Sequence, residues 1–254
     1  MSDSDSENEK IIITPYISKM PDIKKILNNK IPAMIPKLPI ISSVIARTNS
    51  GKSVIICSLI ADYYIPLGIF REQDVFYFSP SINIDDTYKK LPQGIRRFET
   101  YDEGYILGII NEMKEKIQMH GKFNVPQILF VFDDMISEHS ENGRGAFHNN
   151  SVLSKLFTRG RHWNINTFVT SQKYTSLSRT IRVNSLQVIL LNMNEGELET
   201  IMDDWASKNK KKSFYAMMDR IFNVGNPYAS LYINTSEKDV KKRYIVNFDY
   251  YEHY

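Results

Sequence analysis

The chain has 254 residues, of which 42% are hydrophobic and 24% charged, and its formal net charge at pH 7 is +3. This length allows one large α/β domain or two small ones. The single cysteine, Cys57, excludes a disulfide framework and a cysteine zinc site within one chain, and we expect it to be a small core residue in a reduced, intracellular setting. The sequence contains no run of the roughly 20 apolar residues that a membrane span needs, and its acidic N-terminus lacks the apolar core of a signal peptide.

Charge and proline divide the chain unevenly. Residues 1–9 contain four acidic residues and no basic one, so without them the net charge rises from +3 to +7. A modestly basic body permits a polyanionic partner without requiring one. We expect residues 1–10 to form an acidic disordered tail. Residues 11–39 contain five prolines and are expected to form an arm with one short helix near 22–27, packed on its own domain or on a neighbouring subunit. Residues 40–254 form the main domain.

Strands and helices alternate along the main domain. Apolar runs predict strands at 40–46, 74–79, 127–132, 165–170 and 187–191, and a closing hairpin at 229–234 and 243–248. Helices are predicted at 53–64, 85–91, 103–119, 151–159, 196–205 and 214–222, and a mobile loop at 137–149. This order predicts an α/β fold with a mainly parallel central sheet flanked by helices.

The segment ARTNSGKS at 46–53 matches the phosphate-loop signature G-x-x-x-x-G-K-[ST], except that Ala46 replaces the first glycine. Backbone N–H groups of such a loop surround the β-phosphate of ATP, helped by the positive end of the following helix. Lys52 would bridge the β- and γ-phosphates, and Ser53 would give its hydroxyl to Mg²⁺. Alanine fits the first position if its φ is not positive. The expected nucleotide-binding residues are Ala46, Arg47, Thr48, Asn49, Ser50, Gly51, Lys52 and Ser53.

The segment ILFVFDD at 128–134 is a predicted strand that ends in two acidic residues, the Walker B pattern. Such a strand delivers carboxylates to the edge of the sheet where ligands bind. Asp133 is expected to hold Mg²⁺ through water, and Asp134 to orient or deprotonate the attacking water. The alternative is an acidic turn after a strand, but the phosphate loop and the acidic pair in this order together indicate nucleotide hydrolysis.

Three residues after the acidic pair are candidates for completing the site. Gln172 ends the predicted fourth strand, where it would sense the γ-phosphate or the attacking water if that strand neighbours the Asp133 strand. Its alternative role is a strand-capping amide. Arg161 and Arg182 would each supply positive charge to the phosphate of a neighbouring subunit, or else are surface arginines. His162 is expected to pack or hydrogen-bond rather than to act as a base.

These motifs resemble the poxvirus-type genome-packaging ATPases of the FtsK–HerA superfamily, which occur in large DNA viruses and virophages. The resemblance is carried by KLPIISSVIARTNSGKS at 38–53, LFVFDDM at 129–135, GRHWNINTFVTSQ at 160–172, and Arg182 followed two residues later by Asn184. It implies a RecA/FtsK-like P-loop fold with an additional strand between the phosphate-loop strand and the acidic strand. By motif position it also implies the roles given above to Lys52, Ser53, Asp133, Asp134 and Gln172, and it leaves open which arginine acts as the finger.

The same resemblance implies partners and a location. It implies a homo-oligomeric ring, hexameric or pentameric, with ATP at the subunit interfaces. It also implies motor action on double-stranded DNA, a capsid or virion vertex protein as a partner, and a place in the virion and the host cytoplasm, at the viral factory.

Two basic clusters and two other functions remain open. The clusters are solvated faces or contacts to DNA phosphates, and they consist of Lys208, Lys210, Lys211 and Lys212, and of Lys241, Lys242 and Arg243. The first alternative function is a small-molecule or nucleotide kinase of the P-loop class, although such kinases normally have an arginine-rich lid and no sensor glutamine. The second is a non-catalytic, nucleotide-gated assembly protein.

Overall fold

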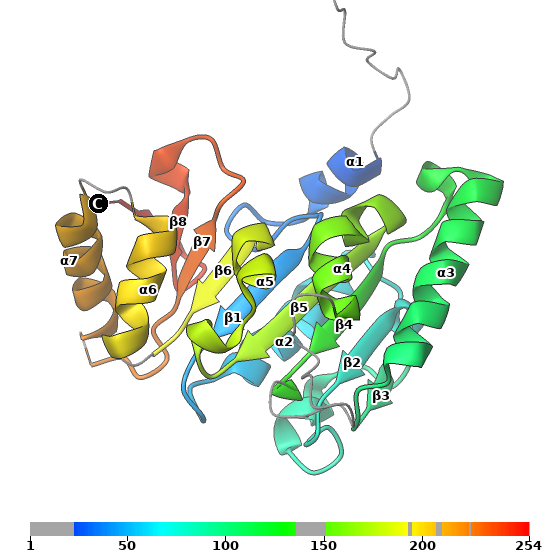
Figure 1. Cartoon of the computed structure of the whole chain (residues 1–254), viewed down its shortest axis with the longest axis horizontal. Coiled ribbons are helices and arrows are strands. Elements are labelled where there is room, and N and C mark those ends of the chain that lie inside the picture. The colour runs from blue at the N-terminus through cyan, green and yellow to red at the C-terminus, as the bar shows by residue number, and fades with distance from the viewer. Residues whose placement is uncertain (1–22, 136–150, 193–194, 207–209, 224, 254) are drawn as a thin grey trace, which may run out of the picture.

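The computed structural model describes residues 23–135, 151–192, 195–206, 210–223 and 225–253. The expected acidic tail, the first part of the arm and the expected loop at 137–149 lie outside these residues. Figure 1 shows one central twisted sheet with helices on both of its faces. In the described part of the chain, no helix is both long enough and apolar enough to cross a membrane.

The strands form a single sheet in the order β3-β2-β4-β5-β1-β6-β7-β8-β9. The strands from β3 to β6 in this order are parallel to one another, and β7, β8 and β9 continue the sheet as an antiparallel meander. Their bounds are β1 (Ile41–Ile45), β2 (Val75–Phe78), β3 (Arg96–Phe98), β4 (Ile128–Phe132), β5 (Ile165–Ser171), β6 (Gln187–Leu190), β7 (Leu231–Asn234), β8 (Tyr244–Val246) and β9 (Tyr250–Glu252). The mainly parallel α/β sheet predicted from the sequence is confirmed.

Helices cover both faces of the sheet, as a parallel sheet requires. The α-helices are α1 (Ile23–Lys30), α2 (Lys52–Ser58), α3 (Glu103–His120), α4 (Val152–Arg159), α5 (Arg179–Asn184), α6 (Glu195–Trp205) and α7 (Lys211–Phe222). A π-helical turn, η1 (Leu59–Tyr64), continues α2. The short 3₁₀ turns are η2 (Glu72–Asp74), η3 (Asp86–Lys90), η4 (Lys122–Asn124), η6 (Gly160–Trp163), η7 (Tyr174–Ser176) and η9 (Val240–Lys242).

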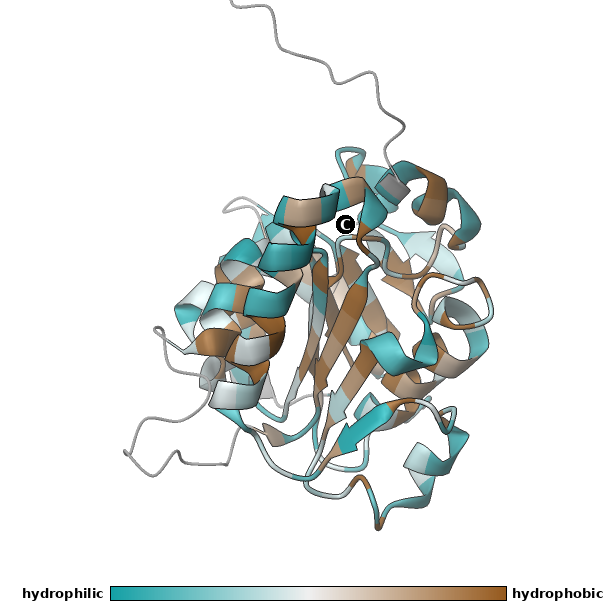
Figure 2. Cartoon of the chain, turned by 90° about the vertical axis from the view of Figure 1, so that its right-hand side faces the viewer, coloured by the Kyte–Doolittle hydropathy of each residue, from teal (hydrophilic) through white to brown (hydrophobic). Residues whose placement is uncertain are grey.

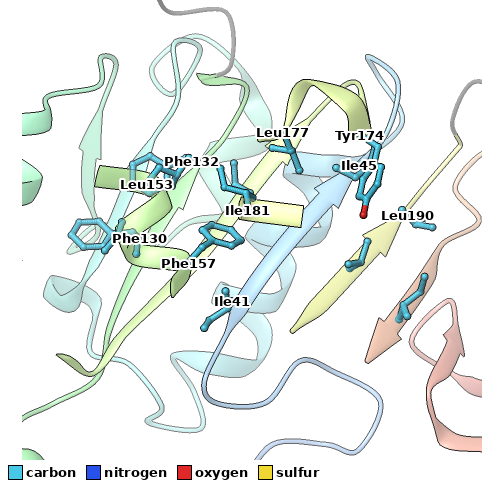
Figure 3. Packing of buried hydrophobic residues seen from close by; sticks show 14 of the residues in the cluster. Ile41, Ile45, Phe130, Phe132, Leu153, Phe157, Tyr174, Leu177, Ile181 and Leu190 are labelled. Carbon is cyan, nitrogen blue, oxygen red and sulfur yellow. The ribbon is translucent and has the colours of Figure 1, made fainter. Parts of the chain in front are cut away.

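Alternate residues of each central strand face two different hydrophobic cores. In β1, Ile41 and Ile45 pack under α3 to α7, whereas Val44, and Ala46 directly after the strand, pack under α2 and η1. The first of these cores is drawn in Figure 3, where Phe157 of α4 and Ile181 of α5 lie over the strands. Figure 2 shows hydrophobic strands enclosed between helices whose outer faces are hydrophilic. This two-sided burial explains why the strands read as continuous apolar runs in the sequence.

Residues of the proline-rich arm that follow α1 pack on the domain itself. Ile31, Ile35 and Leu38 are buried in the core under α2. The Asn28 side chain accepts a hydrogen bond from the Leu38 N–H and donates one to the Leu38 carbonyl, both at 2.8 Å. These paired bonds hold the end of α1 against the segment that leads into β1.

The register of the three central strands sets the position of the site. Strand β5 lies between β1 and β4, as the resemblance implied. Ile45 of β1 is level with Ser171 of β5, and Phe132 of β4 is level with Val169 of β5. Because all three strands are parallel, the segments that follow them leave at one edge of the sheet. This edge, at the carboxyl ends of β1, β4 and β5, is called the phosphate-loop edge below.

Candidate active site

The segment 46–53 is a strand-to-helix loop closely tied to the neighbouring strands. The Ala46 N–H donates to the Ser171 carbonyl, and the Arg47 N–H to the Asn192 carbonyl, each at 3.1 Å. The loop then turns through left-handed backbone at Asn49 (φ 60°) and at Gly51 (φ 90°), which precedes α2. Ala46 does not have a positive φ, so alanine replaces the usual glycine there without backbone strain.

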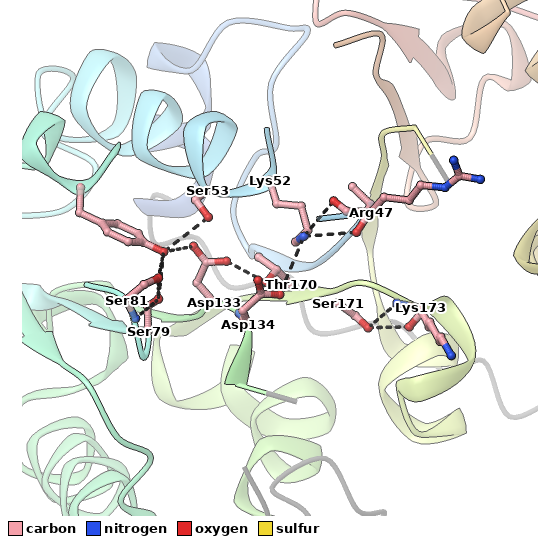
Figure 4. Close-up of polar contacts among 12 residues, drawn as sticks. Arg47, Lys52, Ser53, Ser79, Ser81, Asp133, Asp134, Thr170, Ser171 and Lys173 are labelled. Atoms are coloured by element: carbon pink, nitrogen blue, oxygen red, sulfur yellow. Dashed lines mark hydrogen bonds and ion pairs between the residues drawn. The ribbon is translucent and has the colours of Figure 1, made fainter. Parts of the chain in front are cut away.

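Lys52 is buried at the start of α2, with only 4% of its side chain exposed. Its ammonium group donates to the carbonyl oxygens of Ala46 and Arg47, each at 3.2 Å, and lies 3.8 Å from Oδ1 of Asp134 (Figure 4). A buried ammonium must be compensated by such partners. The lysine is therefore held inside the loop, facing the acidic pair of β4.

Asp133 is fully buried and accepts three hydrogen bonds from hydroxyl groups. Thr170 of β5 donates to Oδ1 at 2.8 Å, and Tyr77 of β2 and Tyr88 of η3 donate to Oδ2 at 2.7 and 3.1 Å. Strand alternation points Asp133 toward α2, because Leu129 and Val131 of the same strand pack in the core on that side. Three hydrogen bonds thus set the orientation of this carboxylate.

Asp134 follows in left-handed backbone, with φ 55°. Its N–H donates to the Thr170 hydroxyl at 2.8 Å, so one threonine hydroxyl contacts both acidic residues. Burial raises the pKa of the Asp134 carboxyl above its ordinary value, and the nearby Asp133 charge adds to that rise. The Lys52 ammonium and a hydrogen bond with the Gln172 side chain act in the opposite direction. Gln172, itself exposed, therefore lies beside Asp134 directly after β5, and its role as a sensor stays a prediction.

The residues expected to hold Mg²⁺ lie on either side of one hydroxyl group. The Tyr88 hydroxyl is 3.1 Å from Oδ2 of Asp133 and 3.5 Å from the Ser53 hydroxyl oxygen. Among the described residues, no group of three or more His, Cys, Asp or Glu side chains could form a metal cage. Mg²⁺ in nucleotide sites takes one or two protein oxygens and completes its shell with phosphates and water. Ser53 and Asp133 fit that donor set.

A cavity of about 300 Å³ opens over the loop. It is lined by Thr48, Asn49, Ser50, Gly51, Lys52, Ser53, Val54, Ser81, Asp85, Thr87, Tyr88, Asp134 and Tyr228. The phosphate loop and one acid of the pair thus face the same space.

Cys57, one turn after Ser53 in α2, is buried. Burial raises the pKa of its thiol to about 12, which fits the core role predicted for it.

The two predicted arginines lie in different surroundings. Arg161 is exposed in η6, before β5 begins, so it lies at the edge of the sheet opposite the phosphate loop. Arg182 of α5 is half-buried: it lies 3.4 Å from the Asp204 carboxylate and 5.2 Å from the centre of the Tyr174 ring. Neither arginine lines the cavity of its own chain.

Sequence reasoning missed four residues that bear on the site. Tyr77 and Thr170 occupy buried strand positions, where a hydroxyl needs a partner, so their placement in predicted strands was an available signal. Tyr88 reaches Asp133 from a separate 3₁₀ turn, and no sequence pattern indicates that contact. Arg179 begins α5 in the connection that leaves β5 at the phosphate-loop edge; it is exposed and has no ion pair among the described residues.

Cations gather at the edge opposite the phosphate loop. The ammonium groups of Lys24 and Lys122 both donate to the Arg161 carbonyl, at 3.2 and 2.9 Å. Desolvation lowers the pKa of His162, and the charges of Lys122, Arg161 and Lys24 lower it further. Lys241 and Lys242 of η9 lie at the same edge by topology, because η9 follows the end of β7.

Of the other basic cluster noted in the sequence, Lys211 pairs with Asp203, and Lys208 lies outside the described residues.

The two acids are expected to differ in stability when each is replaced by asparagine. Asp133→Asn leaves at least one buried hydroxyl without an acceptor, so it should lower the free energy of unfolding by about 1–3 kcal/mol. The pKa of Asp134 is raised in the folded state, so its stabilising contribution exists at low pH and is lost as the pH rises through that pKa. Asp134→Asn should therefore not lower stability at pH 7. Urea unfolding of both variants measures this, and equal losses would contradict the described hydrogen bonding.

Comparison with known proteins agrees with this geometry. Residues 35–246 match the family model described as "Poxvirus A32 protein". The B204 genome packaging NTPase of Sulfolobus turreted icosahedral virus 2, in complex with AMPPCP, is 12% identical, with a TM-score of 0.50 over 84% of this chain and 97% of that chain. The B204 DNA-packaging ATPase of Sulfolobus turreted icosahedral virus is 13% identical, with a TM-score of 0.52 over 85% and 100%.

A third structure, the conjugation coupling protein TcpA of pCW3 with ATPγS, is 14% identical and has a TM-score of 0.54 over 83% of this chain and 60% of that chain. These structures show the P-loop ATPase fold. A search of curated proteins found no match. The family model, in contrast, covers the phosphate loop, the acidic pair and the whole parallel sheet. The expected resemblance to poxvirus-type packaging ATPases is thereby confirmed, and the chain belongs to the poxvirus A32 protein family.

Proposed function

We propose that this protein is an ATPase that uses the hydrolysis of MgATP to move double-stranded viral DNA into a capsid. The observation that carries the proposal is the convergence of Lys52, Asp134 and Gln172 beside the buried Asp133 at one edge of the sheet. Two further findings support it. The chain belongs to the poxvirus A32 family, and the similar B204 proteins are described as genome-packaging enzymes.

Each side chain has a distinct part in hydrolysis. The loop N–H groups and the start of α2 bind the phosphates, and Lys52 exchanges its two carbonyl partners for phosphate oxygens. Asp134, held by its bond to Thr170, orients or deprotonates the attacking water, and Gln172 fixes the Asp134 carboxylate from the β5 side. Ser53 and Asp133 are the residues that would hold Mg²⁺, which would neutralise charge at the phosphates when bound. Hydrolysis thus needs side chains from β4, β5 and α2 at once.

The finer parts of the proposal concern the assembly. A homo-oligomeric ring, pentameric or hexameric, would bring a cation from one subunit to the γ-phosphate of the next, where negative charge develops. The cations around His162 and on η9 would contact DNA phosphates without reading sequence, because a motor must pass every base pair. A capsid or virion vertex protein is the proposed docking partner, and the virion and the host cytoplasm, at the viral factory, are the proposed locations.

ATP hydrolysis with and without double-stranded DNA tests the function. We expect the wild-type protein to hydrolyse ATP and DNA to raise the rate. Lys52→Ala should reduce turnover at least about 100-fold, because it removes the charge partner of the transferred phosphate. Lys116→Ala, which changes a partly exposed lysine on α3 that pairs with Glu112, serves as the matched control and should not alter turnover.

Two outcomes would favour the other functions. Transfer of phosphate to a nucleotide or another small molecule would support the kinase, and nucleotide binding without turnover would support the assembly protein. A folded Lys52→Ala variant that hydrolyses ATP like the wild type would reject the phosphate-loop assignment altogether.

The arginine that acts between subunits can be identified by mixing variants. We expect Arg179→Ala to unfold at the wild-type temperature, because Arg179 is exposed and has no ion pair in its own described chain. The variant should bind ATP but lose most hydrolysis, because Arg179 begins α5 at the phosphate-loop edge, from which it can reach the nucleotide of a neighbouring subunit. Mixing it with Lys52→Ala should restore activity, since an intact loop can then face an intact arginine. Arg161→Ala and Arg182→Ala are tested in parallel. Arg182→Ala should also lower stability, because it breaks the contacts with Asp204 and Tyr174.

In rings shown to be mixed, restoration by the Arg161 or Arg182 variant instead would transfer the role to that residue. Restoration by none of the three would contradict an arginine supplied by a neighbour.

A further inference from the structure

Tyr228 lies beside the phosphate loop although it is far from it in the sequence. Its side chain lines the cavity over the loop, and a β-carbon placed on Gly51 would lie 3.7 Å from the Cδ1 atom of its ring. Single exposed aromatic residues are common on protein surfaces, so the 66% exposure of Tyr228 would mean little elsewhere. Here, an exposed aromatic ring at the wall of the cavity can contact a ligand bound there.

Local hydrogen bonds hold the turn that carries this ring. The N–H of Tyr228 donates to Oδ1 of Asn226 at 3.0 Å, and the N–H of Ala229 donates to the Asn226 carbonyl at 3.1 Å. The next residue, Ser230, is buried and donates its N–H to Oδ1 of Asn247 at 2.9 Å. The turn that presents Tyr228 is therefore anchored to the sheet directly before β7 begins.

The sheet order decides which part of a nucleotide would meet this ring. Asp134 and Gln172 follow β4 and β5, on one side of β1, so the γ-phosphate end of a bound nucleotide points to that side. Strand β7 is antiparallel to β6, and its start therefore lies at the phosphate-loop edge, on the other side of β1. Tyr228 therefore lies on the other side of β1 from Asp134 and Gln172, the side toward which the end of a nucleotide remote from the γ-phosphate would extend.

We propose that Tyr228 stacks on the base of the nucleoside triphosphate bound by the phosphate loop. Val54, in the first turn of α2, also lines the cavity and is 51% exposed, so it gives the base or sugar a second apolar contact. Stacking on an aromatic ring contributes affinity without selecting among bases, since every base has a π-face. This inference rests on the proposed function, because it requires that a nucleotide occupy the loop.

Calorimetric titration with two ligands separates base binding from phosphate binding. The ligands are a non-hydrolysable ATP analogue and inorganic tripolyphosphate, each with Mg²⁺. Tyr228→Ala should weaken binding of the analogue about tenfold and leave tripolyphosphate binding unchanged. Tyr228→Phe, which keeps the ring, should bind both ligands like the wild type. Tyr215→Ala, which removes a tyrosine that is 47% exposed on α7, is the matched control and should change neither affinity.

Three outcomes would overturn the inference. Binding of the analogue by Tyr228→Ala as tight as that of the wild type would show that the ring does not meet the base. Equal loss of both ligands would show that Tyr228 only supports the loop around Gly51. A wild-type protein that binds neither ligand would contradict the proposed function itself, and the stacking role with it.

Discussion

The hydroxyl group of Thr170 contacts both residues of the acidic pair. It donates to Asp133 and accepts from the N–H of Asp134, and it belongs to β5, the strand inserted between the phosphate-loop strand and the acidic strand. Strand β5 also accepts the N–H of Ala46 at its Ser171 carbonyl. One strand therefore fixes the start of the phosphate loop on one side, and the Asp133 carboxylate and the Asp134 backbone on the other. The distance between Lys52 and Asp134 follows from that arrangement.

The two acidic residues of the site differ in burial and in hydrogen bonding. Asp133 is fully buried, with three hydroxyl donors, so replacing it disturbs the core as well as the chemistry. Asp134 is more exposed, and its raised pKa reflects a carboxylate that burial destabilises and that Lys52 partly compensates. A group in that state can respond to the arrival or departure of a phosphate. The difference between these neighbouring acids is thus a property of their surroundings.

Much of the fold could be predicted because the central strands are buried on both faces. Continuous apolar runs, followed by the signatures of the loop and the acidic pair, indicated β1, β4 and β5 and the order of the site residues. The strand β3 was missed because Arg96–Phe98 is short, largely exposed and arginine-rich. Helix α5 was missed because its six residues, RTIRVN, include β-branched residues that favour strands, and its start depends on the Ser178 cap. Strand β9 was missed because it has only three residues.

Contacts between distant segments were beyond sequence reasoning. Tyr88 meets Asp133 through a 3₁₀ turn, and Tyr228 meets Gly51 through a turn before β7; both depend on the tertiary arrangement alone. Arg161 and Arg182 stood out in the sequence as equivalent basic residues, yet one lies at the opposite edge of the sheet and the other is paired with Asp204. The sequence gives the order of the site residues along the chain, whereas the arrangement of the strands decides at which edge of the sheet each residue lies.

The central claim is that β5 sets the geometry for hydrolysis, and steady-state ATPase kinetics of Thr170→Val test it most directly. Valine keeps the shape of threonine but loses the hydroxyl that holds both acids. At a temperature where the variant is folded, we predict that kcat falls at least about tenfold while ATP binding stays close to that of the wild type, because Asp134 loses its orientation. Thr170→Ser should keep most of the activity. A Thr170→Val variant with wild-type kcat would contradict the account.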